Sequence, residues 1–229
     1  MKLNGMPAKF AVLLGVGALA AAAASAAPAR ETASAATLPA SPALAASAKS
    51  ALRYVLASEG NEARYFAREQ LAGVRFPNDA IGVTKAMTGT LVLGADGRIV
   101  PTESKFVVDV TKLKSDRDRR DGYVQRRTLE TEKYPTVDLV PKEVRGLHGP
   151  LPDSGSATFQ LLGDLTVKGV TRPTVWQVSA RFRGDTISGT ASTGFTFDDF
   201  QMQKPSVSIV LSVDDSLHLQ YDFRLIPAR

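Results

Sequence analysis

The sequence contains no cysteine, only two histidines and a single tryptophan in 229 residues. Without cysteine the fold has no disulfide bond and no thiol nucleophile, and two isolated histidines argue against a zinc site. His148 lies in a glycine-proline loop and His218 on a polar strand face, so both are predicted to be solvated rather than catalytic bases. A glycine-rich phosphate loop and a serine nucleophile elbow are also lacking. The sequence therefore predicts no catalytic residue, no metal and no cofactor.

The chain after residue 50 also has little excess of positive over negative charge. The net charge is +5, but four basic residues and one acidic residue precede residue 51. The remainder has 24 basic and 22 acidic residues, a net charge of +2. Nucleic-acid-binding domains usually carry a stronger basic bias, so no nucleic-acid partner is predicted.

The N-terminal stretch has the pattern of a targeting segment. Lys2 and Lys9 precede an apolar run of fifteen residues (10–24), and Ala24-Ser25-Ala26 is a small-residue cleavage site. This pattern predicts a cleaved secretory signal peptide over residues 1–26 and a periplasmic or secreted protein. An uncleaved anchor is the alternative, but the run is shorter than the ~20 residues that span a membrane. Residues 27–50 are rich in Ala, Ser and Pro and are predicted to be a disordered leader.

Residues 51–229 suit one domain, and alternation of apolar and polar residues predicts that it is all-β. The clearest alternation lies on the two sides of a predicted corner at residues 169–173. The apolar faces of these two strands are Phe159, Leu161, Gly163, Leu165 and Val167, then Trp176, Val178, Ala180 and Phe182. Further strands are predicted at 88–93, 104–110 and 186–197, and a C-terminal hairpin at 207–213 and 217–225 with its turn at 214–216.

Residues 115–133 break the alternation because they are highly charged. They are predicted to form either a short helix or a long charged loop. Short strands buried on one side favour an antiparallel barrel or sandwich, and a closed barrel removes exposed strand edges.

Five short motifs occur in an order that resembles the YceI-like family. They are residues 108–113 (VDVTKL), Arg120-Asp121, Tyr134-Pro135, residues 163–173 (GDLTVKGVTRP) and residues 198–200 (DDF). The resemblance covers nearly all of residues 51–229, with Tyr123 where the family often has histidine. It implies an extended antiparallel eight-stranded lipocalin-like barrel with a helix, exported to the periplasm or beyond. It also implies that a polyisoprenoid or another long apolar lipid is held inside the barrel.

This resemblance, together with the inward-facing pattern, gives a set of candidate site residues. The predicted cavity wall is Phe106, Val108, Phe159, Leu161, Leu165, Val167, Trp176, Val178 and Phe182. The predicted mouth, which would meet a phosphate or a membrane head group, is Arg120, Asp121 and Tyr123. A filled core is the alternative for each wall residue, and a solvated surface with local ion pairs is the alternative for the charged segment.

The function predicted from these residues is a non-enzymatic lipid-binding protein that acts as a carrier, a sequestering agent or a stress-related store. Burying ten methylene groups would contribute on the order of 8 kcal/mol before ordering costs, so no catalytic residue is required. Two alternatives stay open: a hydrolase with a convergent acid–base pair near the barrel mouth, and a solid-core protein that interacts through its exterior. The sequence also allows a transient membrane-surface contact and a homodimer.

Overall fold

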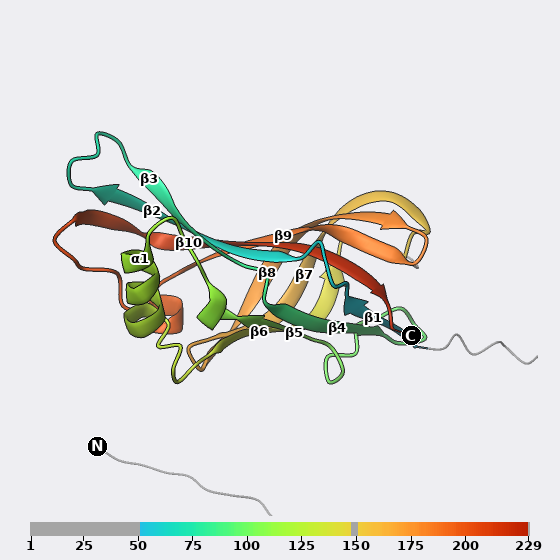
Figure 1. Cartoon of the computed structure of the whole chain (residues 1–229). Helices are drawn as coiled ribbons and strands as arrows, with labels where there is room; N and C mark the ends of the chain where they lie inside the picture. The colour runs from blue at the N-terminus through green and yellow to red at the C-terminus, as the bar shows by residue number, and fades with distance from the viewer. Residues whose placement is uncertain (1–50, 148–150, 229) are drawn as a thin grey trace, which may run out of the picture. The chain divides into compact units, whose positions relative to one another are not determined.

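The computed structural model describes residues 51–147 and 151–228 (Figure 1). The predicted signal peptide, the predicted leader and His148 lie outside these residues. The strands described are β1 (Leu52–Leu56), β2 (Glu62–Leu71), β3 (Asn78–Thr84), β4 (Met87–Leu93), β5 (Lys105–Asp109), β6 (Thr136–Arg145), β7 (Ser154–Val167), β8 (Val170–Arg183), β9 (Thr186–Thr196) and β10 (Val210–Pro227). The helical turns are η1 (Val110–Lys112), α1 (Asp118–Tyr123), η2 (Val124–Thr128) and η3 (Asp198–Phe200).

Antiparallel pairing closes the sheet into the predicted eight-stranded barrel. The ring runs β1-β4-β5-β6-β7-β8-β9-β10, and the pairing of β10 with β1 closes it. β2 continues the line of β1 along β10, and β3 pairs with β2, so these two strands extend the wall at one end. The backbones of Val83 on β3 and Lys114 bond to each other there and tie this extension to the chain before α1. The predicted fold class is confirmed.

The hairpin between β7 and β8 is tighter than the predicted corner at residues 169–173. Only Lys168 (φ 51°) and Gly169 (φ 76°) form the turn, and two positive φ angles in a two-residue loop match the twist of the flanking strands. A Cβ at Gly169 would lie 2.8 Å from the ring of Tyr134, so this position also needs glycine for space. Pro173 lies within β8 opposite Asp164, and its assignment to the corner was therefore wrong.

The predicted C-terminal hairpin was also wrong, because β10 is one continuous strand. Asp214 to Ser216 do not reverse the chain; they form an irregularity in the pairing with β2 between Val213 and Leu217. Asp215 is held there from outside the strand, since its carbonyl accepts from the Phe197 backbone and its carboxylate pairs with Lys204. Residues that often form turns can instead form a β-bulge when the strand continues on both sides of them.

One-sided burial of the strands agrees with the predicted alternation. On β8, Trp176, Val178, Ala180 and Phe182 are buried while the residues between them are exposed. At the end of the barrel where β8 finishes, large side chains from several strands fill the interior. These are Tyr54, Leu93, Phe182, Ile187, Phe223 and Leu225.

The charged segment at 115–133 contains a short helix, which decides between the two predicted forms. α1 and the π-helical turn η2 together cover residues 118–128. Figure 1 shows α1 beside the end of the barrel where β2, β3 and β10 project. In the part of the chain that the structure describes, no helix has both the length and the apolar character needed to cross a membrane.

Candidate functional site

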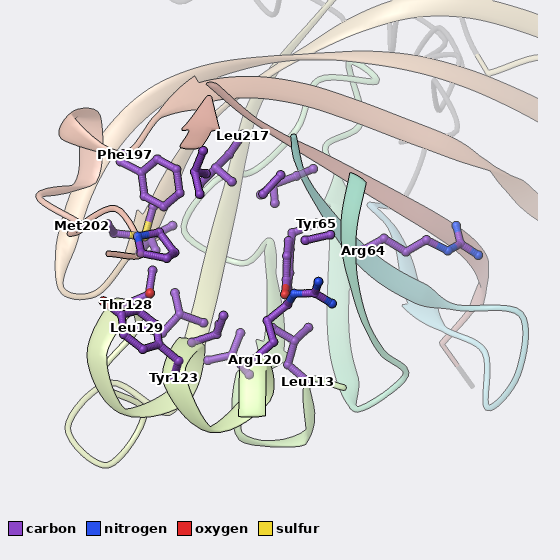
Figure 2. A pocket seen from close by; sticks show the side chains of 18 of the residues that line it. Arg64, Tyr65, Leu113, Arg120, Tyr123, Thr128, Leu129, Phe197, Met202 and Leu217 are labelled. Carbon is purple, nitrogen blue, oxygen red and sulfur yellow. The ribbon is translucent and has the colours of Figure 1, made fainter. Parts of the chain in front are cut away.

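A cavity of about 810 Å³ occupies one half of the barrel interior (Figure 2). We call the end at which β7 stops and β8 starts the mouth end, and the opposite end the filled end. The cavity is lined by inward-facing residues of β2, β3, β5 to β10 and the helical segment, and most of them are apolar. Its volume falls within the ~300–1,000 Å³ that is usual for small-molecule sites.

The inner limit of the cavity lies at the same level on several strands. On β8, Trp176 lines the cavity and Val178 does not; on β10, Tyr221 lines it and Phe223 does not. Phe106 on β5 packs edge-on against Tyr221, with ring centroids 6.0 Å apart. These aromatic side chains therefore form a floor, and a ligand entering at the mouth would reach it last.

The indole of Trp176 already has a hydrogen-bond partner. Its Nε1 donates to the hydroxyl of Thr174 at 3.0 Å, and only 4% of the residue is exposed. The ring therefore meets the cavity as an apolar surface.

Small residues explain why this half is hollow. Ala63 and Ala67 on β2 and Ala80 on β3 point into the cavity, where the filled end has phenylalanine, leucine and tyrosine. Alanine leaves interior space that longer side chains would occupy at native packing density. Sequence reasoning missed these positions. Ala63 and Ala67 fall on the same face of a strand, and two small residues on an inward face were a usable signal.

A charged cluster lies at the mouth between β2 and α1. Arg120 donates to Glu69 at 2.5 Å and also pairs with Asp116 (Figure 2 shows Arg120). The side chains of Glu69 and Arg120 are only 7% and 12% exposed. Burial alone would lower the pKa of the Arg120 guanidinium, but the two carboxylates outweigh it and the pKa is raised. Glu69 was not a sequence candidate.

Asp121 has a structural position instead of a place at the cavity. Its carboxylate accepts from the backbone and the hydroxyl of Ser115, at 2.8 and 2.7 Å, and lies 3.6 Å from Lys114. The side chain is buried and does not line the cavity. Its hydrogen bonds hold Ser115 just before α1, and the assignment of Asp121 to the mouth stays a prediction that its buried position does not favour.

The structure divides the remaining sequence candidates into two groups. Those that line the cavity are Phe106, Val108, Leu165, Val167, Trp176, Arg120 and Tyr123. Those that do not are Phe159, Leu161, Val178 and Phe182. Val178 and Phe182 are almost fully buried in the filled end, and Phe159 and Leu161 pack against that core. Their strand faces point inward as predicted, but these four side chains belong to the core or pack against it and do not form the cavity wall.

The described histidine and the acidic residues of the DDF motif lie outside the cavity. His218 is exposed, lies on the outer face of β10 against Gly194, and is not among the cavity residues. Asp199 is engaged by the backbone and hydroxyl of Thr196 in a local turn. Among the described residues, no group of three or more His, Cys, Asp or Glu is arranged to hold a metal ion.

A family model, YceI-like domain, matches residues 54–225. The chain belongs to the YceI-like family. No match was found among the curated proteins. The matched residues extend over the whole ring of strands from β1 to β10, so the family assignment covers the barrel that contains the cavity.

Solved structures share this fold at low sequence identity. A polyisoprenoid binding domain from Saccharophagus degradans, implicated in plant cell wall breakdown, has a TM-score of 0.57 and 10% identity, covering 77% of this chain and 99% of that one. Burkholderia cenocepacia BcnA has a TM-score of 0.54 and 14% identity, covering 72% of this chain and 95% of that one. A Campylobacter jejuni YCEI protein has a TM-score of 0.51 and 14% identity, covering 70% and 91%.

Proposed function

We propose that this protein binds a polyisoprenoid or a similar long apolar lipid in its barrel and acts as a carrier, a sequestering agent or a store. The observation that carries the proposal is the cavity of about 810 Å³ with its mostly apolar wall. The structural similarity to a polyisoprenoid binding domain supports it. Each buried methylene contributes about 0.8 kcal/mol, so a chain reaching the floor gains its affinity from burial.

Binding without catalysis fits the chemistry of the cavity. Arg120 at the mouth is engaged with Glu69 and Asp116, and the inner half of the cavity is aromatic and aliphatic. A hydrolase needs a positioned base beside an acid or nucleophile. The exposed His218 is outside the cavity, and the carboxylates at the mouth form ion pairs.

Export to the periplasm or beyond is part of the proposal and rests on the N-terminal sequence pattern. Fractionation of cells that express the full chain, with N-terminal sequencing of the product, tests it. A mature protein that begins near residue 27 supports export with cleavage, and a cytoplasmic product with Met1 retained or only Met removed contradicts it.

Contact with a membrane surface is the proposed source of the ligand. Exposed apolar residues gather at the mouth end on the β2–β3 turn, on the segment that leads into β10 and on the first residues of β10: Val74, Phe76, Val207, Ile209 and Leu211. Phe76 is 70% exposed and Leu211 is 65% exposed. Figure 1 shows that this hairpin and the start of β10 project at the same end as α1. Val207 and Ile209 also line the cavity, so the exposed surface is continuous with its interior.

Mass spectrometry of an organic extract of gently purified protein tests the function directly. A long-chain lipid present in stoichiometric amount supports the proposal. A clean extract, combined with failure of the protein to take up a fluorescent isoprenoid analogue, contradicts it. Light scattering of the same preparation tests whether the protein forms the homodimer that the sequence allows.

A further inference from the structure

Two polar side chains of β2 point into a cavity that is otherwise mostly apolar. The inward face of this strand presents Ala63, Tyr65, Ala67 and Glu69, all of which line the cavity. Glu69 is 6% exposed although it carries a carboxylate. Burying a carboxylate is costly even when it is paired, so the position of Glu69 at the cavity calls for an explanation beyond packing.

The guanidinium of Arg120 is already occupied by protein groups. One terminal nitrogen donates to Glu69 and the other to Asp116. The planar fork that would grip a phosphate through two oxygens is therefore engaged by two carboxylates. Counting Arg117, which pairs with Asp116, the cluster has two positive and two negative charges, so it offers an anion no excess positive charge.

Hydrogen-bonding capacity remains on Glu69 and Tyr65. Within the described residues, the carboxylate of Glu69 uses Oε1 for Arg120, and no hydrogen bond to Oε2 is found. The hydroxyl of Tyr65 likewise makes no hydrogen bond to a described residue, and Figure 2 shows it beside Arg120 at the cavity. Burial raises the pKa of Tyr65 to about 12, so this hydroxyl keeps its proton and can donate.

We propose that Glu69 and Tyr65 form the head-group site of the ligand and that this site takes an uncharged, hydroxyl-bearing group. The ligand hydroxyl donates to the Glu69 carboxylate and accepts from the Tyr65 hydroxyl. The chain attached to it runs along the alanine-lined wall to the floor at Trp176. A phosphate at the same place would meet the carboxylate of Glu69 and be repelled. This inference rests on the proposed function and specifies the chemical class of its ligand.

Arg117 and Arg119 define the rival site for an anion. Both are exposed and line the outer rim of the mouth, and Arg117 lies 3.5 Å from Asp116. A phosphate bound at the rim would keep its tail in the cavity but leave Glu69 without a ligand contact. The two sites make opposite predictions about which head group binds more tightly.

Three probes with the same C20 chain separate these sites: geranylgeraniol, its methyl ether and its monophosphate. Binding is followed by the fluorescence of Trp176, the single tryptophan in the chain. We expect the alcohol to bind at least tenfold more tightly than the monophosphate and several-fold more tightly than the ether, which cannot donate to Glu69. A monophosphate that binds as tightly as the alcohol or more tightly overturns the proposal, and weakening of that binding by Arg119→Ala would assign the head group to the rim.

Glu69→Gln removes the charge and keeps the shape of the side chain. This variant should reduce the preference for the alcohol over the monophosphate by about tenfold or more, while Glu103→Gln should leave it unchanged. Glu103 is a matched control because it also pairs with an arginine, Arg53, but on the exposed surface. Tyr65→Phe, which removes only a hydroxyl, should weaken the alcohol and the ether by similar several-fold factors, because the oxygen of each can accept from Tyr65. An unchanged preference in a folded Glu69→Gln variant contradicts the site. Failure of all three probes to bind the wild-type protein overturns the proposed function itself, and this inference with it.

Discussion

The two halves of the barrel interior differ in content although the same strands build both. At the filled end, Phe182 and Phe223 close the interior, whereas alanines on β2 and β3 leave about 810 Å³ open toward the mouth. The helical segment and the exposed apolar residues Phe76 and Leu211 also belong to the mouth end. We therefore expect the filled half to supply stability, and the hollow half is the proposed binding site.

The largest expected effect is at the filled end. Phe182→Ala removes one of the largest fully buried side chains and should destabilise the protein by about 3–5 kcal/mol. Urea unfolding followed by circular dichroism measures this loss. Ligand affinity of the folded variant should change little, because Phe182 does not line the cavity. A loss of stability below about 1 kcal/mol would show that this end is less tightly packed than we describe.

A larger side chain should weaken ligand uptake when it is added in the hollow half and should lower stability when it is added in the filled half. Ala67→Phe places a ring in the cavity and should weaken lipid uptake at least tenfold, about 1.4 kcal/mol, with stability maintained. Ala180→Phe, in the packed half, should instead cost about 1–3 kcal/mol of stability. Trp176 fluorescence titrations and urea unfolding of both variants give the comparison. Unchanged uptake by Ala67→Phe would contradict the position of the ligand.

The sequence predicted the barrel well because strand alternation depends on local periodicity. The inward faces of β7 and β8 were correct, yet Leu165 and Trp176 line the cavity while Leu161 and Val178 do not. Periodicity identifies the face that points inward, but the hollow level depends on side chains contributed by other strands. Glu69 was missed for a related reason, since its partner Arg120 lies 51 residues away in the sequence.

Exposed apolar residues at the mouth should contribute to membrane binding and not to the stability of the fold. Phe76→Ser combined with Leu211→Ser should lower binding to anionic phospholipid vesicles several-fold, because both side chains are exposed at the mouth end. Leu52→Ser is the matched control, as Leu52 is 41% exposed on β1 and does not line the cavity. Vesicle co-sedimentation measures the difference. Equal losses in the two proteins would contradict a specific membrane-facing end.

The smallest expected effect is a change in acid stability from Asp222, where β10 pairs with β2. Burial opposes ionisation of Asp222, but hydrogen bonds from Arg64 and Thr190 prevail and lower its pKa. A lowered pKa adds stability that is complete above the unfolded value of about 3.9 and is lost as the pH falls through the folded value. The wild-type protein should therefore lose stability more steeply below about pH 4 than Asp222→Asn. Melting temperatures across this range measure both slopes, and parallel slopes would assign acid sensitivity to other groups.

The most direct test of the account asks whether a long chain enters tail-first and stops at Trp176. A long-chain isoprenoid alcohol carrying bromine at its tail end, and an isomer carrying bromine beside the hydroxyl, are titrated into the protein. Bromine quenches tryptophan on contact, and the chain has only one tryptophan, at the cavity floor. We predict strong quenching by the tail-brominated alcohol and weak quenching by its isomer. Equal quenching by both, or quenching by neither when binding is saturated, would contradict a lipid held in the hollow half of the barrel.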